Sequence, residues 1–321
     1  MELRGPYLQH LRNTASLCTT YEAKRKGFIE LALEKNRRGT PFVNEGRSLK
    51  STASQAHSPN ELLSIPAIRN GLLKAAGVSD KAENHLSEQD MENAIVEFIK
   101  EFLEPAGEHF VEELVYRFLL TKGDALGGMM RNIEGAWAQK KLADAIFAAL
   151  NITGIRYSVL LKSTPHWFPV VDSSIDTMNV KGVRWIKDDT PKTIFFNIKV
   201  PFVGDKGNNI DICVFNRLLD KPAKEIIQVK DIYLALGELK GGIDPAGADE
   251  HWKTANSALS RIREAFGDAS VVPKLFFVGA AIEQSMANEI WAQLEKGELH
   301  NAGNMTNFDH LNAICRWLIE L

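Results

Sequence analysis

Two acids and a lysine, Asp211, Glu238 and Lys240, carry charge where the surrounding sequence is apolar, in the runs IDICVF (210–215) and DIYLALGELK (231–240). An acid among apolar neighbours needs a partner, because burying an unpaired carboxylate is costly. Both runs have the composition of buried strands, and alternate residues of a strand share a face, so Glu238 and Lys240 point the same way. If the two strands are paired neighbours, the three side chains converge.

That combination suits hydrolysis of a phosphodiester. Two carboxylates hold an oxygen-seeking cation such as Mg²⁺, which polarises a phosphate oxygen and lowers the pKa of water. Asp211 and Glu238 are the candidate metal ligands, and Lys240 orients the attacking water or stabilises developing negative charge. The alternative is a structural ion pair at two strand ends. The Glu-x-Lys spacing alone is uninformative, since it recurs at Glu22–Lys24 in a charged helical stretch.

His251 follows Lys240 after the loop GGIDPAGADE, at the start of a helix predicted over 249–266 with Asp249 as its N-cap. Backbone N–H groups at a helix N-terminus favour an anion such as phosphate. We therefore predict that His251 is a general base or positions the water. The alternative is an ordinary surface histidine.

The elements that position these residues read as an α/β domain that follows a helical one. Strand-like runs occupy 157–161, 193–202, 210–215, 232–236 and 274–282, and helices are predicted over 249–266, 284–296 and 308–320. Residues 1–120 are predicted to form a helical domain that embraces DNA with a basic N-terminal arm, including a polar loop or arm over 39–60. Residues 121–321 are predicted to form a catalytic domain with a mixed sheet.

Composition excludes several classes of protein. The three cysteines form no CxxC pair, which argues against a Cys-based zinc site, and neither GxxxxGK[ST] nor GxGxxG occurs, so no nucleotide cofactor is expected. No secretion signal or membrane-spanning run is evident, so we expect a cytoplasmic protein without a membrane partner. Residues 1–50 carry ten Lys/Arg against five Asp/Glu, and residues 80–120 carry eleven acids against three bases. This asymmetry fits either a basic surface facing phosphates or two solvated helical faces of opposite sign.

Longer strings of residues carry a resemblance to a known family. Asp211 followed by Glu238-Leu239-Lys240 resembles the D…(D/E)xK site of type II restriction endonucleases. The string ELKGGIDPAGADEHWKT (238–254), with its histidine, is similar to the AvaI/BsoBI restriction enzymes, and GDALGGMMRNIEGAWAQ (123–139) resembles a segment of such enzymes. The likeness covers most of the chain. It departs from the superfamily pattern at Ile210, which stands where proline commonly precedes the aspartate.

The resemblance implies a mixed-sheet PD-(D/E)xK nuclease core and a homodimeric, Mg²⁺-dependent endonuclease of a bacterial restriction–modification system. Its substrate would be double-stranded DNA at the palindrome CYCGRG, cut to leave 5′ overhangs, with each subunit cleaving one strand. Asp211 and Glu238 would hold the metal, Lys240 would support the attacking water, and His251 would be the general base.

Sequence specificity requires contacts with base edges. Asp244 is a candidate acceptor for cytosine N4, although it also suits a turn before Pro245. Lys81 is a candidate donor to guanine.

Three residues of the segment 123–139 are further candidates. Arg131 is a candidate phosphate contact, whereas Asp124 and the glycines fit the start of a helix equally well. Glu134 could be an acid that supports the site, and the sequence leaves its role open.

Two other functions remain as alternatives. One is a nuclease of repair or recombination that recognises DNA structure rather than sequence. The other is a non-catalytic DNA-binding protein, which would bind DNA without a metal and tolerate Lys240→Ala.

Overall fold

The computed structural model describes residues 5–170, 175–267 and 269–321, apart from the side chain of Arg131. The chain forms two compact units, Met1–Phe28 with Ile133–Leu321, and Ile29–Asn132. Residues 5–28 therefore belong with the sheet rather than with the helical domain predicted over 1–120. Hydrogen bonds explain this assignment, since Thr19 Oγ1 donates to the Ala280 carbonyl at 2.7 Å and Asn304 Nδ2 donates to the Leu17 carbonyl at 2.8 Å.

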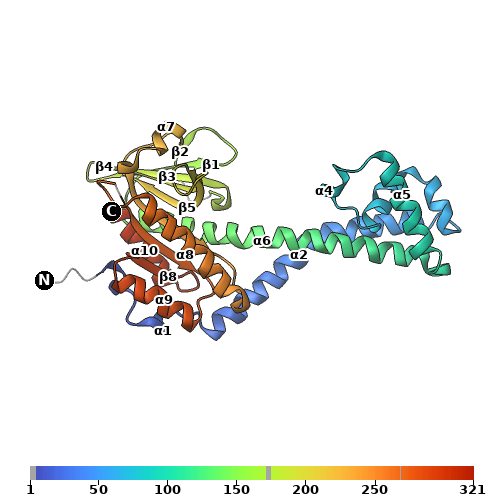
Figure 1. Ribbon diagram of the computed structural model, residues 1–321, viewed down its shortest axis with the longest axis horizontal. Coiled ribbons are helices and arrows are strands. Elements are labelled where there is room, and N and C mark those ends of the chain that lie inside the picture. Colours follow the sequence, from blue (N-terminus) through green and yellow to red (C-terminus); the bar gives the residue numbers. More distant parts are fainter. Residues whose placement is uncertain (1–4, 171–174, 268) are drawn as a thin grey trace. The chain divides into compact units, whose positions relative to one another are not determined.

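The larger unit is built on one mixed sheet of eight strands (Figure 1), which confirms the predicted α/β class. The strands are β1 (Tyr157–Leu161), β2 (Trp167–Pro169), β3 (Val180–Lys187), β4 (Thr190–Val200), β5 (Asn208–Phe215), β6 (Tyr233–Lys240), β7 (Lys274–Gly279) and β8 (Asn301–Asn304). Their order is β2-β1-β3-β4-β5-β6-β7-β8. Neighbours from β2 to β6 are antiparallel, whereas β6, β7 and β8 are parallel.

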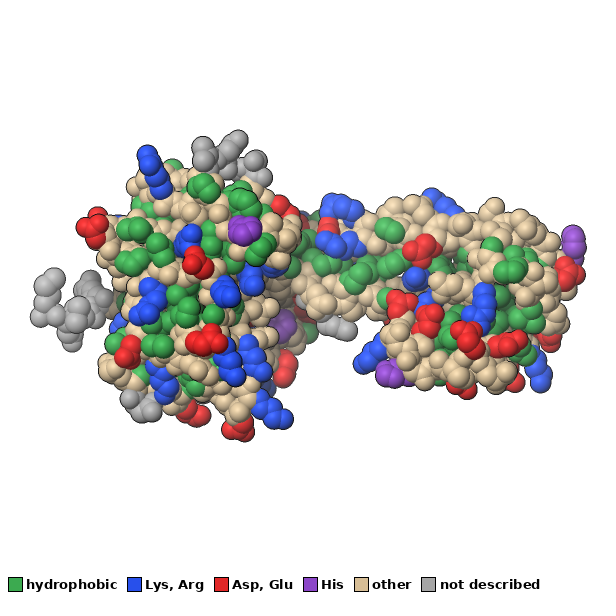
Figure 2. Space-filling model, turned by 90° about the horizontal axis from the view of Figure 1, so that it is seen from above, with side chains coloured by type: hydrophobic (Ala, Val, Ile, Leu, Met, Phe, Trp, Pro, Cys, Tyr) green, Lys and Arg blue, Asp and Glu red, His purple; other side chains and the backbone are tan. Residues whose placement is uncertain are grey.

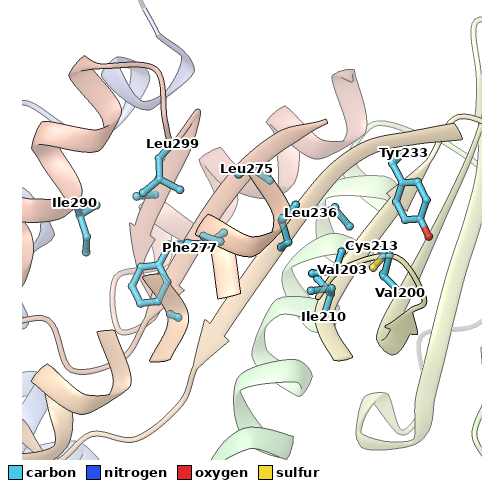
Figure 3. Packing of buried hydrophobic residues seen from close by; sticks show 14 of the residues in the cluster. Val200, Val203, Ile210, Cys213, Tyr233, Leu236, Leu275, Phe277, Ile290 and Leu299 are labelled. Atoms are coloured by element: carbon cyan, nitrogen blue, oxygen red, sulfur yellow. The ribbon is translucent and has the colours of Figure 1, made fainter. Parts of the chain in front are cut away.

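Helices cover both faces of the sheet. Parallel neighbours need crossover connections, which α8 (Ala248–Ala265) provides between β6 and β7 and α9 (Gln284–Glu295) between β7 and β8. These two helices pack on one face in a core that includes Tyr233, Leu236 and Phe277 (Figure 3). The end of α6 (Phe110–Ile152) and α10 (Phe308–Glu320) pack on the other face. The sheet is thus buried on both sides, and its strand ends remain as the places where charged residues can gather.

The smaller unit is helical, as predicted, but its helices are longer than the sequence suggested. It contains most of α2 (Tyr21–Ala53), together with α3 (Arg69–Ala75), α4 (Asp80–Glu83), α5 (Glu88–Phe98) and the first part of α6. The larger unit also contains the short helices α1 (Thr14–Leu17) and α7 (Lys224–Ile227). The loop predicted over 39–60 is wrong up to Ala53, because α2 continues through Pro41 and buries Leu49 and Ala53 in the core of this unit. Tertiary packing of this kind outweighs a polar composition.

Helix α6 is also continuous where Asp124 and the glycines of GDALGG suggested the start of a helix. It runs from Phe110 to Ile152, so the predicted boundary between residues 120 and 121 falls inside it. Asp124 is an exposed residue within this helix and does not shape its start. Each glycine costs a helix about 1 kcal/mol relative to alanine, and the packed residues on both sides of GDALGG compensate for that loss.

On the face seen in Figure 2, Lys and Arg side chains are interspersed with Asp and Glu side chains. Charge on that face therefore does not by itself mark a DNA-facing surface. In the part of the chain that the structure describes, no helix is long and apolar enough to cross a membrane.

Candidate active site

The pairing of β5 with β6 brings the three predicted residues together. The two strands are antiparallel, and Ile212 of β5 pairs with Gly237 of β6. The next residues along this register are Asp211 and Glu238, which therefore lie side by side. Gly237 has no side chain for a steric reason, since a Cβ there would lie 2.3 Å from the Phe276 ring. The predicted neighbour relation of the two strands is confirmed.

The charged atoms of this cluster lie within contact distance. Lys240 Nζ donates to Glu238 Oε2 at 3.2 Å and lies 3.9 Å from Asp211 Oδ2. The same oxygen of Asp211 accepts the backbone N–H of Leu239 at 2.8 Å. Asp211 is thereby fixed by the β6 backbone, and one lysine faces two carboxylates.

Glu238 is the most buried member of the cluster. The residue is 4% exposed, and its Oε1 is buried with no hydrogen-bond partner among the described residues. Burial first, and then the nearby Asp211 carboxylate, raise the pKa of Glu238 to about 8, and Lys240 opposes this shift only partly. A single ammonium therefore does not compensate two adjacent carboxylates, one of which is desolvated.

This donor set fits a divalent cation. Mg²⁺ is commonly held by one or two protein carboxylates together with water and substrate phosphate, and Asp211 and Glu238 supply such a pair. The unpartnered Glu238 Oε1 is an oxygen that a cation would satisfy, and its charge would favour the ionised form of Glu238. The described residues contain no group of three or more His, Cys, Asp or Glu that could hold a metal ion.

His251 lies in the first turn of α8, close to the glycines that follow Lys240. The helix begins at Ala248 with Gly247 as its N-cap, so Asp249 lies in the first turn and is not the predicted cap. The imidazole packs against Gly242, where a Cβ would lie 2.4 Å from its Cε1. No hydrogen bond or ion pair joins His251 to Asp211, Glu238 or Lys240 among the described residues. The ring is connected to this cluster through its packing against Gly242, two residues after Lys240.

Helix α6 adds an acid whose place the sequence left undecided. The carbonyl oxygen of Glu134 lies 2.2 Å from where a Cβ on Gly241 would stand, and Glu134 Oε2 lies 3.4 Å from the corresponding point on Gly242. The paired glycines after Lys240 were the visible signal of this close approach. The partner that they accommodate is distant in sequence, and a single chain gives no pattern that identifies it.

The three predicted DNA contacts come from separate elements of the chain. Asp244 is exposed, and its Oδ1 accepts the Ala246 N–H at 2.9 Å. It thereby caps the short 3-10 helix Pro245–Gly247, which agrees with the alternative that Asp244 is a turn residue before Pro245. Lys81 is exposed in α4 of the smaller unit. Arg131 falls within α6, and its side chain lies outside the described part of the structure.

Comparison with known proteins gives matches over nearly the whole chain. The family model described as restriction endonuclease BsobI matches residues 7–321. The type II restriction enzyme AvaI of Nostoc sp. (strain PCC 7120 / SAG 25.82 / UTEX 2576) is 51% identical over 317 residues, which cover 98% of this chain and 100% of that protein. The type II restriction enzyme BsoBI of Geobacillus stearothermophilus is 48% identical over 328 residues, which cover 100% of both proteins.

Proposed function

Because this chain belongs to the BsobI restriction endonuclease family, we propose that it is a Mg²⁺-dependent type II enzyme that cuts double-stranded DNA at a short palindrome. The proposed site is CYCGRG or a close relative, with cleavage leaving 5′ overhangs. A palindrome has two-fold symmetry, so the active form would be a homodimer in which each subunit cleaves one strand.

The observation that carries this proposal is the convergence of Asp211, Glu238 and Lys240 at the end of β6. A structural ion pair would need one acid for one lysine. The cluster instead holds a second carboxylate and leaves a buried oxygen of Glu238 without a partner. The raised pKa of Glu238 reflects the cost of ionising both acids in the isolated protein, and a cation shared with a phosphate group would offset that cost.

Each residue has a separate role in the proposed reaction. Asp211 and Glu238 would hold the cation, which when bound polarises the scissile phosphate and lowers the pKa of nearby water. Lys240, held by Glu238, would orient the attacking water and place positive charge where negative charge develops. His251 would accept the proton released by that water.

Recognition of the bases would fall to other residues. We keep Asp244, Lys81 and Arg131 as the proposed DNA contacts, with Asp244 accepting from cytosine N4, Lys81 donating to guanine and Arg131 binding phosphate. The exposure of Asp244 and Lys81 supports these roles, since a contact with DNA requires a side chain that DNA can reach.

The test is to digest a plasmid of known sequence with the purified protein and Mg²⁺, and to sequence the fragment ends. We expect discrete fragments whose ends share one palindrome, and intact plasmid when EDTA replaces Mg²⁺. Cleavage confined to branched or flapped DNA would favour a structure-directed nuclease. Metal-independent binding without cleavage would favour a non-catalytic DNA-binding protein.

A further inference from the structure

The two glycines after Lys240 are contact points for two different elements. Gly241 lies against the backbone of α6 at Glu134, and Gly242 lies against the imidazole of His251 at the start of α8. Gly242 is buried, and side-chain atoms of both residues surround the point where its Cβ would stand, with His251 Nδ1 at 3.2 Å and Glu134 Oε2 at 3.4 Å. The strand end thus brings an acid and a histidine to one place from opposite directions.

Both of these polar groups are incompletely satisfied. His251 Nδ1 is buried and has no hydrogen-bond partner among the residues that the structure describes. Glu134 is half-buried and makes no hydrogen bond or ion pair with any residue that the structure describes. Burial raises the pKa of Glu134, while His251 is the neighbour that favours its charged form. An unpaired carboxylate and an unpaired ring nitrogen around one point are complementary in hydrogen bonding.

Other acids are less suitable partners for the ring. Asp244 uses a carboxylate oxygen to accept the backbone N–H two residues further on. Asp249 and Glu250 are exposed on the same helical turn as His251. Glu134 combines partial burial, a carboxylate that bonds to none of the described residues, and an approach from a different element.

We propose that Glu134 is a positioning residue for His251. Its carboxylate accepts a hydrogen bond from Nδ1–H of the imidazole, and this bond sets the ring's orientation and leaves Nε2 as the proton acceptor. The inference rests on the proposed function, in which His251 takes the proton from the attacking water. His251 Nδ1 lies 3.2 Å and Glu134 Oε2 lies 3.4 Å from the same point, and the proposed bond requires a change in the side-chain torsions of Glu134.

The chemistry of imidazole explains why such an acid would matter. A neutral imidazole carries its proton on one of two nitrogens, and the hydrogen bond that one nitrogen makes determines which nitrogen is free to accept a proton. Without an acceptor at Nδ1, the ring also populates the tautomer whose Nε2 is already protonated. Partners of this kind typically change activity about 10- to 100-fold.

The experiment compares single-turnover cleavage by Glu134→Gln, Glu134→Asp and Glu250→Gln, with DNA binding measured separately in Ca²⁺. We expect Glu134→Gln to lower the cleavage rate constant about 10- to 100-fold with DNA affinity unchanged. Glu134→Asp should restore part of that rate, since it keeps the carboxylate. Glu250→Gln removes an exposed carboxylate beside His251 and should cleave like the unmodified protein.

A double variant separates positioning from a general structural effect. If Glu134 acts through His251, then adding Glu134→Gln to His251→Ala costs no further rate. Additive losses, or equal losses in Glu134→Gln and Glu134→Asp, would overturn the inference. Normal cleavage by Glu134→Gln beside slow cleavage by His251→Ala would also overturn it and leave the proposed function intact, whereas normal cleavage by Lys240→Ala would overturn the proposed function itself.

Discussion

The Asp211 carboxylate accepts the backbone N–H of Leu239 at 2.8 Å. This side-chain hydrogen bond follows directly after the backbone pairing of β5 with β6, which reaches Ile212 and Gly237. The strand that carries Glu238 and Lys240 therefore holds the first acid in place through its own backbone. One consequence is that Asp211 and Glu238 lie side by side at the same edge of the β5–β6 pair. Several measurable properties depend on that arrangement.

The first prediction concerns the pH dependence of stability without metal. The pKa of Glu238 is raised to about 8 in the folded chain from its ordinary value of 4.5. A group with a raised pKa contributes stability that is fully present below pH 4.5 and is lost as pH rises through about 8. We expect the free energy of unfolding to fall over this range in EDTA, and Glu238→Gln to remove most of that fall because it cannot ionise.

Tryptophan fluorescence during urea unfolding measures this effect, since all six tryptophans lie within 133–321 in the unit that carries the sheet. Mg²⁺ should stabilise the unmodified protein at pH 8 and should leave Glu238→Gln nearly unchanged. Glu264→Gln, an exposed acid on α8, is the matched control. A parallel pH slope in Glu238→Gln and the unmodified protein would show that Glu238 is not the group responsible.

The second prediction concerns the glycine against which His251 packs. A Cβ at Gly242 would lie 2.4 Å from His251 Cε1, so Gly242→Ala must displace the ring. Displacements of about 1 Å in an active site cost up to about 100-fold in rate, and we expect a loss of at least about 10-fold in single-turnover cleavage. Gly247→Ala is the control, because its Cβ would lie 3.5 Å from the same ring atom, in ordinary contact. Equal rates for the two variants would argue against a role of the ring's position.

The third prediction concerns acid stability at the far end of the sheet. His310 Nδ1 accepts the Asn304 N–H at 3.1 Å, and burial, followed by the neighbouring His10, lowers the pKa of His310 to about 4. Since the folded pKa lies below the ordinary 6.5, this histidine's contribution is fully present above pH 6.5 and is lost as pH falls to about 4.

Protonation of His310 should thus cost on the order of 2–3 kcal/mol by pH 4. The variant His310→Asn keeps an acceptor near the Nδ1 position without a titrating group, so its unfolding free energy should fall less between pH 7 and pH 4. The exposed His166→Asn serves as the control. An unchanged acid slope in His310→Asn would contradict this assignment.

The chain's pattern predicted the sheet elements that carry the chemistry. β5 and β6 were recognisable as apolar runs with isolated charges, and the buried stripe of α8, which includes Trp252, Ala255 and Leu259, has helical spacing. Their neighbour relation was an assumption that the pairing of Ile212 with Gly237 confirms. The strands β2, β3 and β8 were not among the predicted runs. The strand β8, with the sequence NAGN, was missed because asparagine and glycine are depleted in strands, and its burial comes from packing alone.

The remaining errors arose where distant packing decides local structure. Polar residues over 39–53 looked like a loop, yet Leu49 and Ala53 join a core formed by segments far along the chain. Glycines inside α6 suggested the start of a helix, whereas packing on both sides of them keeps the helix continuous. The approach of Glu134 to His251 depends on α6 passing the end of β6, and nothing in the local sequence of either residue records that approach.

The most direct test of the central claim compares cleavage and binding by the unmodified protein and Lys240→Ala on DNA that contains the mapped site. We expect Mg²⁺-dependent cleavage that falls about 100- to 1,000-fold in Lys240→Ala, while site-specific binding in Ca²⁺ is retained. Lys253→Ala, at the start of α8, controls for the loss of one exposed lysine. Undiminished cleavage by Lys240→Ala would contradict the catalytic role of this cluster. Asp211, Glu238 and Lys240 would then be interpreted as a structural group of ion-paired residues.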